Sequence, residues 1–143
     1  MKIFLAIVLL IGIFYNIKEA RKVSLRTKTR PVELFIIGLA GLGFISLSYI
    51  FDKTLLGYTL AVLATGLISS AIFLPGIGPR GVLVFTGPNL ILKFIDLKDI
   101  DTIKIKKTKA YLRLDIGAHS THYIQSYDKS DRKTIKRFLG ENL

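Results

Sequence analysis

The sequence contains no cysteine and no tryptophan, and only 10 acidic residues stand against 21 Lys and Arg. Without cysteine, the 143-residue chain forms no disulfide, no thiolate metal site and no cysteine nucleophile. The shortage of acidic residues leaves a formal net charge of +11, yet 50% of the residues are hydrophobic. A soluble domain rarely combines these properties, so we expect apolar and basic residues to be segregated along the chain, as in membrane proteins.

Three apolar runs predict transmembrane helices at residues 1–17, 32–51 and 55–74. Runs of about 20 apolar residues are long enough to cross a hydrocarbon core of about 30 Å. The first run is shorter, and a cleaved signal peptide is the alternative; the residues after Ile17 offer no small-residue cleavage site, which favours a retained helix. Only three residues separate the second and third runs, so 32–74 is predicted to form a helical hairpin.

Basic residues are concentrated on one side of these helices. The predicted loop 18–31 carries six Lys and Arg, and 13 more follow the third helix, whereas the other side has only Lys2 and Lys53. The positive-inside rule therefore predicts a multi-pass protein of the plasma (inner) membrane, with its N-terminus outside and its C-terminal domain in the cytoplasm.

Small residues recur at every fourth position of the third helix, at Gly57, Ala61, Thr65 and Ser69. Small side chains let two helix backbones approach closely within a membrane. The stripe predicts close helix packing, and the partner is either the second helix of the hairpin or another chain, as a homo-oligomer or a complex with a membrane protein.

Residues 76–143 read as a small α+β domain with an antiparallel sheet. Strands are predicted at 82–85, 90–95, 103–106, 111–116 and 121–127, where apolar runs or strict alternation lie between turn residues. A short basic helix follows, starting near Asp128 or Ser130, with Ile135, Phe138 and Leu139 as its apolar stripe.

The segment Ile95-Asp96-Leu97-Lys98-Asp99-Ile100, which leads into an alternating strand, resembles the turn into a strand of bacterial PH-like domains. The strand order and the final amphipathic helix resemble that family too, although Leu97 stands where the family has an aromatic residue. The resemblance covers the last 65 or so residues. It implies a curved sheet closed by the C-terminal helix, a barrel that is incomplete or completed by a second copy, and a binding or scaffolding role without a cofactor.

Three motifs suggest chemistry, and each has a simpler explanation. The segment 76–81 matches G-x-G-x-x-G, but it enters a strand, not the helix that a dinucleotide site requires, so we interpret it as a flexible exit from the membrane. His119 and His122 are three residues apart, so on a strand they project to opposite faces and do not converge on a metal. Asp96, Asp99 and Asp101 suit turns and caps. We expect no catalytic residue, metal or cofactor.

The basic residues of the C-terminal domain are the better candidates for function. A domain held at the cytoplasmic leaflet would gain about 1 kcal/mol from each Lys or Arg near anionic lipid headgroups. Nucleic acid is not an expected partner, because no aromatic residues interleave with Lys104 to Lys109. We therefore expect a non-enzymatic membrane-surface interaction or scaffold module; the alternative is an immunity protein against a membrane-active peptide or toxin. The predicted contact residues are Lys104, Lys106, Lys109, Lys129, Arg132, Lys133, Lys136 and Arg137.

Overall fold

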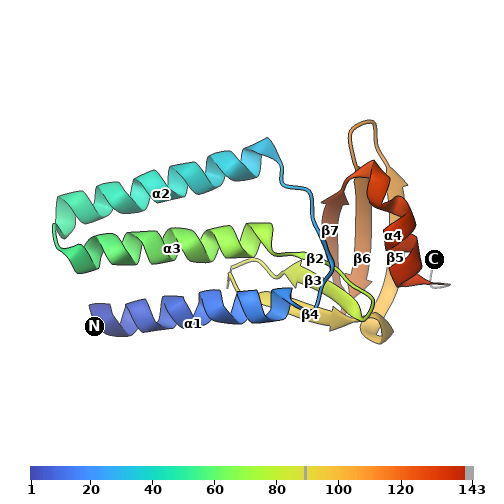
Figure 1. The fold of residues 1–143 in the computed structure, drawn as a ribbon, viewed down its shortest axis with the longest axis horizontal. Helices are drawn as coiled ribbons and strands as arrows, with labels where there is room; N and C mark the ends of the chain where they lie inside the picture. The colour runs from blue at the N-terminus through green and yellow to red at the C-terminus, as the bar shows by residue number, and fades with distance from the viewer. Residues whose placement is uncertain (89, 141–143) are drawn as a thin grey trace.

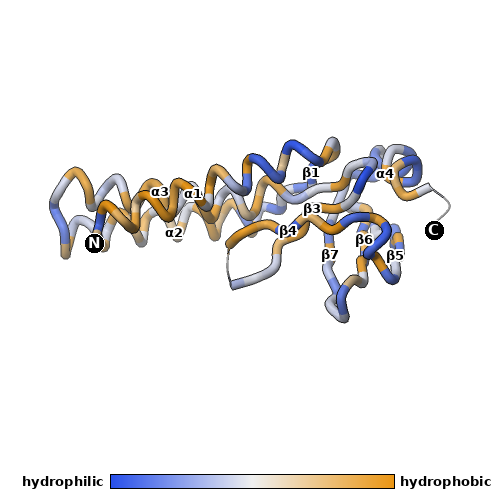
Figure 2. The backbone as a smooth tube through the Cα atoms, turned by 90° about the horizontal axis from the view of Figure 1, so that it is seen from below, coloured by the Kyte–Doolittle hydropathy of each residue, from blue (hydrophilic) through white to orange (hydrophobic). Residues whose placement is uncertain are grey.

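Three long helices lie side by side and lead into a sheet domain at one end (Figure 1). The computed structural model describes residues 1–88 and 90–140. Its first helices are α1 (Lys2–Ala20), α2 (Pro31–Phe51) and α3 (Leu55–Phe73), and all three are long and apolar enough to cross a membrane. The tube in Figure 2 is hydrophobic along most of their length.

Helix α2 shows how much apolar surface these helices expose. It has no buried residue, and Phe35 and Leu42 are 69% and 67% exposed. Monomeric soluble proteins do not leave apolar surface of this extent in water. The structure therefore agrees with three membrane-spanning helices, with α3 packed between α1 and α2 (Figure 1).

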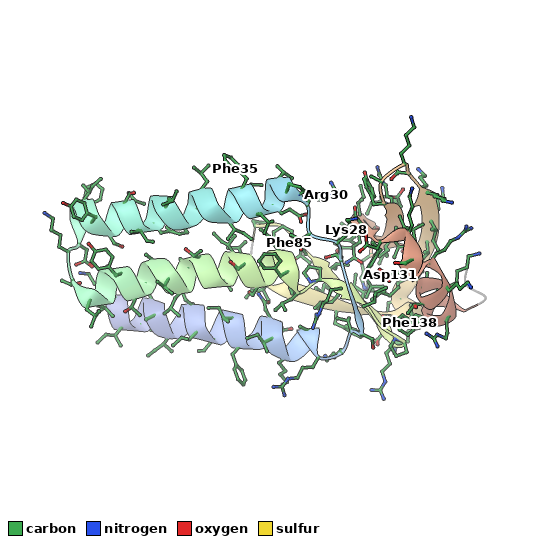
Figure 3. All side chains as sticks on the ribbon, turned by 45° about the horizontal axis from the view of Figure 1, so that its top comes forward. Lys28, Arg30, Phe35, Phe85, Asp131 and Phe138 are labelled. Atoms are coloured by element: carbon green, nitrogen blue, oxygen red, sulfur yellow. The ribbon has the colours of Figure 1, made fainter. Side chains whose placement is uncertain are left out.

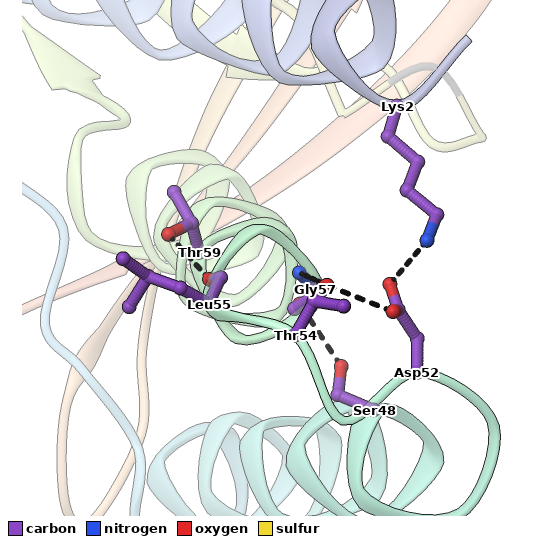
Figure 4. Close-up of polar contacts among 7 residues, drawn as sticks. All are labelled: Lys2, Ser48, Asp52, Thr54, Leu55, Gly57 and Thr59. Carbon is purple, nitrogen blue, oxygen red and sulfur yellow. Dashed lines mark hydrogen bonds and ion pairs between the residues drawn. The ribbon is translucent and has the colours of Figure 1, made fainter.

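Polar contacts hold the turn between α2 and α3 (Figure 4). Thr54 caps α3, since its hydroxyl oxygen accepts from Gly57 N at 3.2 Å, and Ser48 Oγ donates to Gly57 O at 3.0 Å. Lys2 Nζ pairs with an Asp52 carboxylate oxygen at 2.8 Å, which joins the start of α1 to the turn. A Cβ on Gly57 would collide with Asp52, so this close packing requires glycine.

Within the described residues, seven antiparallel strands form two sheets. The first sheet has the order β1 (Leu25–Arg26), β2 (Gly76–Ile77), β3 (Gly81–Phe85) and β4 (Leu92–Asp96). The second has the order β5 (Ile100–Lys107), β6 (Leu112–Ala118) and β7 (Thr121–Tyr127). Single 3₁₀ turns at Leu97–Asp99 and Lys129–Asp131 precede β5 and the last helix, α4 (Arg132–Leu139).

The core of the domain lies between the two sheets and α4. Ile135 and Leu139 of α4 are buried and Phe138 packs beside them, so the predicted apolar stripe closes this core. Tyr127 is also fully buried, and burial raises the pKa of its phenol. Its hydroxyl donates to Gln125 Oε1 at 2.5 Å, and Gln125 Nε2 donates to Leu83 O at 2.8 Å, which satisfies the buried polar atoms.

The prediction that 18–31 is a loop is wrong in part. Residues 18–20 belong to α1, and β1 pairs with β2, Leu25 opposite Ile77. The predicted flexible exit at 76–81 is also wrong, because β2, a tight turn and β3 occupy it, with Gly78 N donating to Gly81 O at 2.9 Å. Gly76 makes this pairing possible, since a Cβ there would collide with the Leu25 carbonyl.

Candidate functional site

The junction between the helices and the sheet is built around Asn16, which sequence reasoning treated only as an interruption of the first apolar run. Asn16 is fully buried in α1. Its Nδ2 donates to Ser70 Oγ of α3 and to Leu90 O, both at 2.9 Å, and its Oδ1 accepts from Leu92 N of β4 at 2.9 Å. One amide therefore connects α1, α3 and the first sheet.

Arg26 makes a second connection at the same level. Its guanidinium donates to Leu74 O at 2.5 Å and to Ala20 O at 2.9 Å, so it binds the last carbonyls of α3 and of α1 together. Carbonyls at helix C-termini lack intrahelical partners, and a cation also suits the negative end of each helix dipole. Desolvation lowers the pKa of this guanidinium, which remains charged.

The linker from β1 to α2 is bound along the edge of β7. Lys28 N donates to Ser126 O at 2.7 Å, and the Lys28 ammonium pairs with Asp128 at 2.6 Å. Arg30 donates to Ser126 Oγ at 2.5 Å, and its guanidinium lies 5.3 Å from the centre of the Tyr111 ring. Together with Asn16 and Arg26, these contacts fix the sheet domain to the helices.

The basic residues of α4 lie at the end of the molecule farthest from the three helices (Figure 1). Because Ile135 and Leu139 face the core, the basic side chains of α4 stay on its outer side. Lys129 Nζ donates to the Lys109 carbonyl oxygen, so the β5–β6 turn adjoins this surface. The structure thus brings together six of the predicted contact residues: Lys109, Lys129, Arg132, Lys133, Lys136 and Arg137.

Lys104 and Lys106 do not belong to this surface. Ile103 and Ile105 of β5 turn toward the core that α4 covers, so the alternating lysines point to the opposite face of the sheet. There the Asp115 carboxylate accepts from Arg113 Nε at 2.6 Å and pairs with Lys106 Nζ at 3.4 Å. The hydrogen bond from Arg113, and then that from Lys106, lower the pKa of Asp115.

The small-residue stripe of α3 contacts α2. Gly57 accepts from Ser48, and Thr65 lies against Gly41, where a Cβ would stand 3.3 Å from Thr65 Cγ2. Ala61 between them is buried. The hydroxyl of Ser69 bonds to Thr65 O in its own helix, at 2.8 Å. These contacts place Gly57 and Thr65 in the α2–α3 interface within one chain.

The remaining sequence motifs do not converge. His119 and Ser120 form the two-residue β6–β7 turn, with φ of 50° and 62°, and His122 lies on β7. Asp96 ends β4, Asp99 ends a 3₁₀ turn and Asp101 lies on β5. Within residues 1–88 and 90–140, no three His, Asp or Glu side chains are grouped to hold a metal ion.

A cavity of about 580 Å³ lies where α2, α3 and β7 meet, and it was not predicted. Its apolar walls include Ile36 of α2, Ile68 and Ile72 of α3, Phe85 of β3 and Ile124 of β7. Its polar wall is formed by the linker and by neighbouring side chains. Figure 3 shows Lys28, Arg30 and Phe85 gathered where the helices reach the domain, whereas Phe35 points outward from α2. The polar lining includes Thr27, Lys28, Arg30, Glu33, His122, Gln125 and Ser126.

These features describe a membrane-associated fold with two candidate binding surfaces, the basic α4 surface and the cavity at the helix ends. Comparison of the chain with models of protein families, with curated proteins and with solved structures finds no match.

Proposed function

We propose that this chain is an integral protein of the plasma membrane that presents a PH-like domain in the cytoplasm and acts as a non-enzymatic scaffold. The PH-like assignment is supported by two antiparallel sheets, of four and three strands, followed by a C-terminal helix that covers the core. The resemblance left open whether the barrel was complete, and β1 and β2 supply strands that the sequence patterns did not reveal.

One observation carries the proposal: the domain is fixed to the helices, and its basic α4 surface faces away from them (Figure 1). With the helices in a membrane, Lys18 and Arg21 at the end of α1 and Arg30 at the start of α2 lie at the level of the headgroups. The α4 surface is then directed into the cytoplasm, where it suits an acidic protein partner better than the lipids of the same membrane. This refines the expectation that α4 itself binds headgroups.

Photocrosslinking of the full chain in its native membrane tests this proposal. A photoreactive residue placed at position 133 should crosslink to one defined protein, and replacing Lys136 and Arg137 with Gln should abolish that product, because charge complementarity governs encounter and orientation. The matched control replaces Lys104 and Lys106, on the other sheet face, with Gln and should retain the product. Crosslinks to lipid alone, or a product unaffected by the α4 changes, would contradict the proposal.

A further inference from the structure

The cavity at the helix ends has apolar walls and, beside them, the cationic side chains of Lys28 and Arg30. Outside the three helices, in the described part of the chain after α3, Phe85 and Ile124 are the large hydrophobic side chains that stay exposed, at 43% and 55%. Both line this cavity. The exposed apolar surface of the domain is therefore concentrated on the side that faces the helix ends.

The position of the cavity along the helices indicates what covers these side chains. Helix α2 has 21 residues, and at about 1.5 Å per residue it is close to the thickness of a hydrocarbon core. Its start at Pro31 and the end of α3 at Phe73 then lie at the boundary between acyl chains and headgroups. Ile36, Ile68 and Ile72 extend the apolar wall about one turn into the hydrocarbon region.

The polar wall lies on the domain side of that boundary. Arg30 has five N–H donors, of which the described residues engage one through Ser126. Lys28 pairs with Asp128, but their side chains are 43% and 57% exposed, so this ion pair contributes little and leaves the ammonium free to turn. The Glu33 carboxylate also lines the cavity and accepts from Arg30 N at 2.8 Å as the helix cap. Because this carboxylate repels an anion, the Lys28 and Arg30 side chains are the place where an anion would bind.

We infer that this cavity binds one membrane phospholipid, with its phosphate at Lys28 and Arg30 and an acyl chain along Ile36, Ile68 and Ile72. The volume lies within the range of about 300–1,000 Å³ that is typical of small-molecule sites. Arg suits this role because its planar fork matches a phosphate. The inference deepens the proposed function, since it needs the helices to span a membrane, but it does not require the α4 surface to bind anything.

Native mass spectrometry of the full chain, released from phosphatidylglycerol nanodiscs, tests the inference. One phosphatidylglycerol molecule should remain bound, and replacing Lys28 and Arg30 with Gln should weaken its retention by about 10-fold or more, given the usual contribution of each cation. Diacylglycerol with the same acyl chains should not be retained. Equal retention of diacylglycerol, or no retained lipid at all, would overturn the inference.

A second variant tests the apolar wall of the cavity and leaves Lys28 and Arg30 of the linker unchanged. Ile124→Trp should fill the cavity from an exposed position on β7 and displace the lipid, whereas Phe35→Trp, on the outward side of α2, should leave retention unchanged. The thermal unfolding of each variant is compared with that of the unaltered chain to check that the fold is intact. If the unaltered chain were instead a lipid-free dimer that Ile124→Trp makes monomeric, the occupant would be a second copy, and the inference would be overturned. The photocrosslink at position 133 reports only on α4, so the two proposals fail separately.

Discussion

At the scale of single residues, Asn16 is the side chain on which the junction depends most. Asn16→Leu keeps a similar side-chain volume but removes three hydrogen bonds. The Leu92 N–H loses its acceptor, and the Ser70 hydroxyl and the Leu90 carbonyl each lose the amide N–H that donates to them. Each buried group left unsatisfied costs about 1–3 kcal/mol, so we expect the free energy of unfolding to fall by at least about 2 kcal/mol. Unfolding of the full chain in detergent, with hydrogen exchange at Leu92 as a local readout, measures this loss.

Thr59→Val is the matched control for this prediction. Thr59 lies exposed on α3, and its hydroxyl donates only to Leu55 O of its own helix, at 2.9 Å. Its replacement should change the free energy of unfolding by no more than about 0.5 kcal/mol. If Asn16→Leu proved equally neutral, the junction would not depend on this amide.

Sequence patterns could not have identified Asn16 as this connection, because its partners lie 54, 74 and 76 residues away. A signal was present, since an uncharged amide near the end of an apolar span needs a buried partner. The same limit applies to Arg26 and Arg30. Their positive charge predicted which side of the membrane they occupy, but their individual contacts depend on the tertiary fold.

At the scale of secondary structure elements, the β5–β6 pair carries a charge-dependent contact. Asp115 on β6 is held by Arg113 and by Lys106 across the strand pair, and its pKa lies below the ordinary 3.8. A lowered folded-state pKa adds stability above the unfolded-state pKa, and that stability is lost as the pH falls through the folded-state value. We therefore expect Asp115→Asn to be destabilising at neutral pH, with a deficit that shrinks from about pH 4 downward.

Unfolding of unaltered protein and of Asp115→Asn over this pH range measures the effect. Asp115→Asn is then made in a chain that already carries Arg113→Gln and Lys106→Gln. There its effect on the free energy of unfolding should depend much less on pH, because the donors that lower the pKa of Asp115 are absent. An unchanged difference between the two proteins at every pH would show that Asp115 acts through packing alone.

The elements that sequence predicted well are those with enough length to display a period. The three apolar helices, the apolar strands β3 and β4, the alternating strands β5 and β6, and strand β7 were recognised within a few residues of their bounds. Strands β1 and β2 have two residues each, which is too short for any alternation, and glycine occupies half of β2. Their pairing comes from chain packing and not from local pattern, so the first sheet could not be predicted completely.

At the scale of the whole molecule, the absence of cysteine makes the proposed orientation directly testable. Lys53→Cys, in the turn between α2 and α3, should react with an impermeant maleimide in intact cells, because the positive-inside rule places this turn outside. Lys109→Cys, in the β5–β6 turn, should react only after the membrane is opened. The unaltered chain has no thiol and is the blank for both. The opposite labelling pattern would reverse the orientation.

The pairing of β1 with β2 has a consequence for biosynthesis. The ribosome completes Leu25 long before Ile77, and the intervening chain contains the two helices of the hairpin. Strand β1 can therefore pair with β2 only after both helices of the hairpin have been synthesised, so the first sheet is completed late. Until then the edge of β2 that β1 covers stays unpaired, and an unpaired strand edge is a site where aggregation can begin.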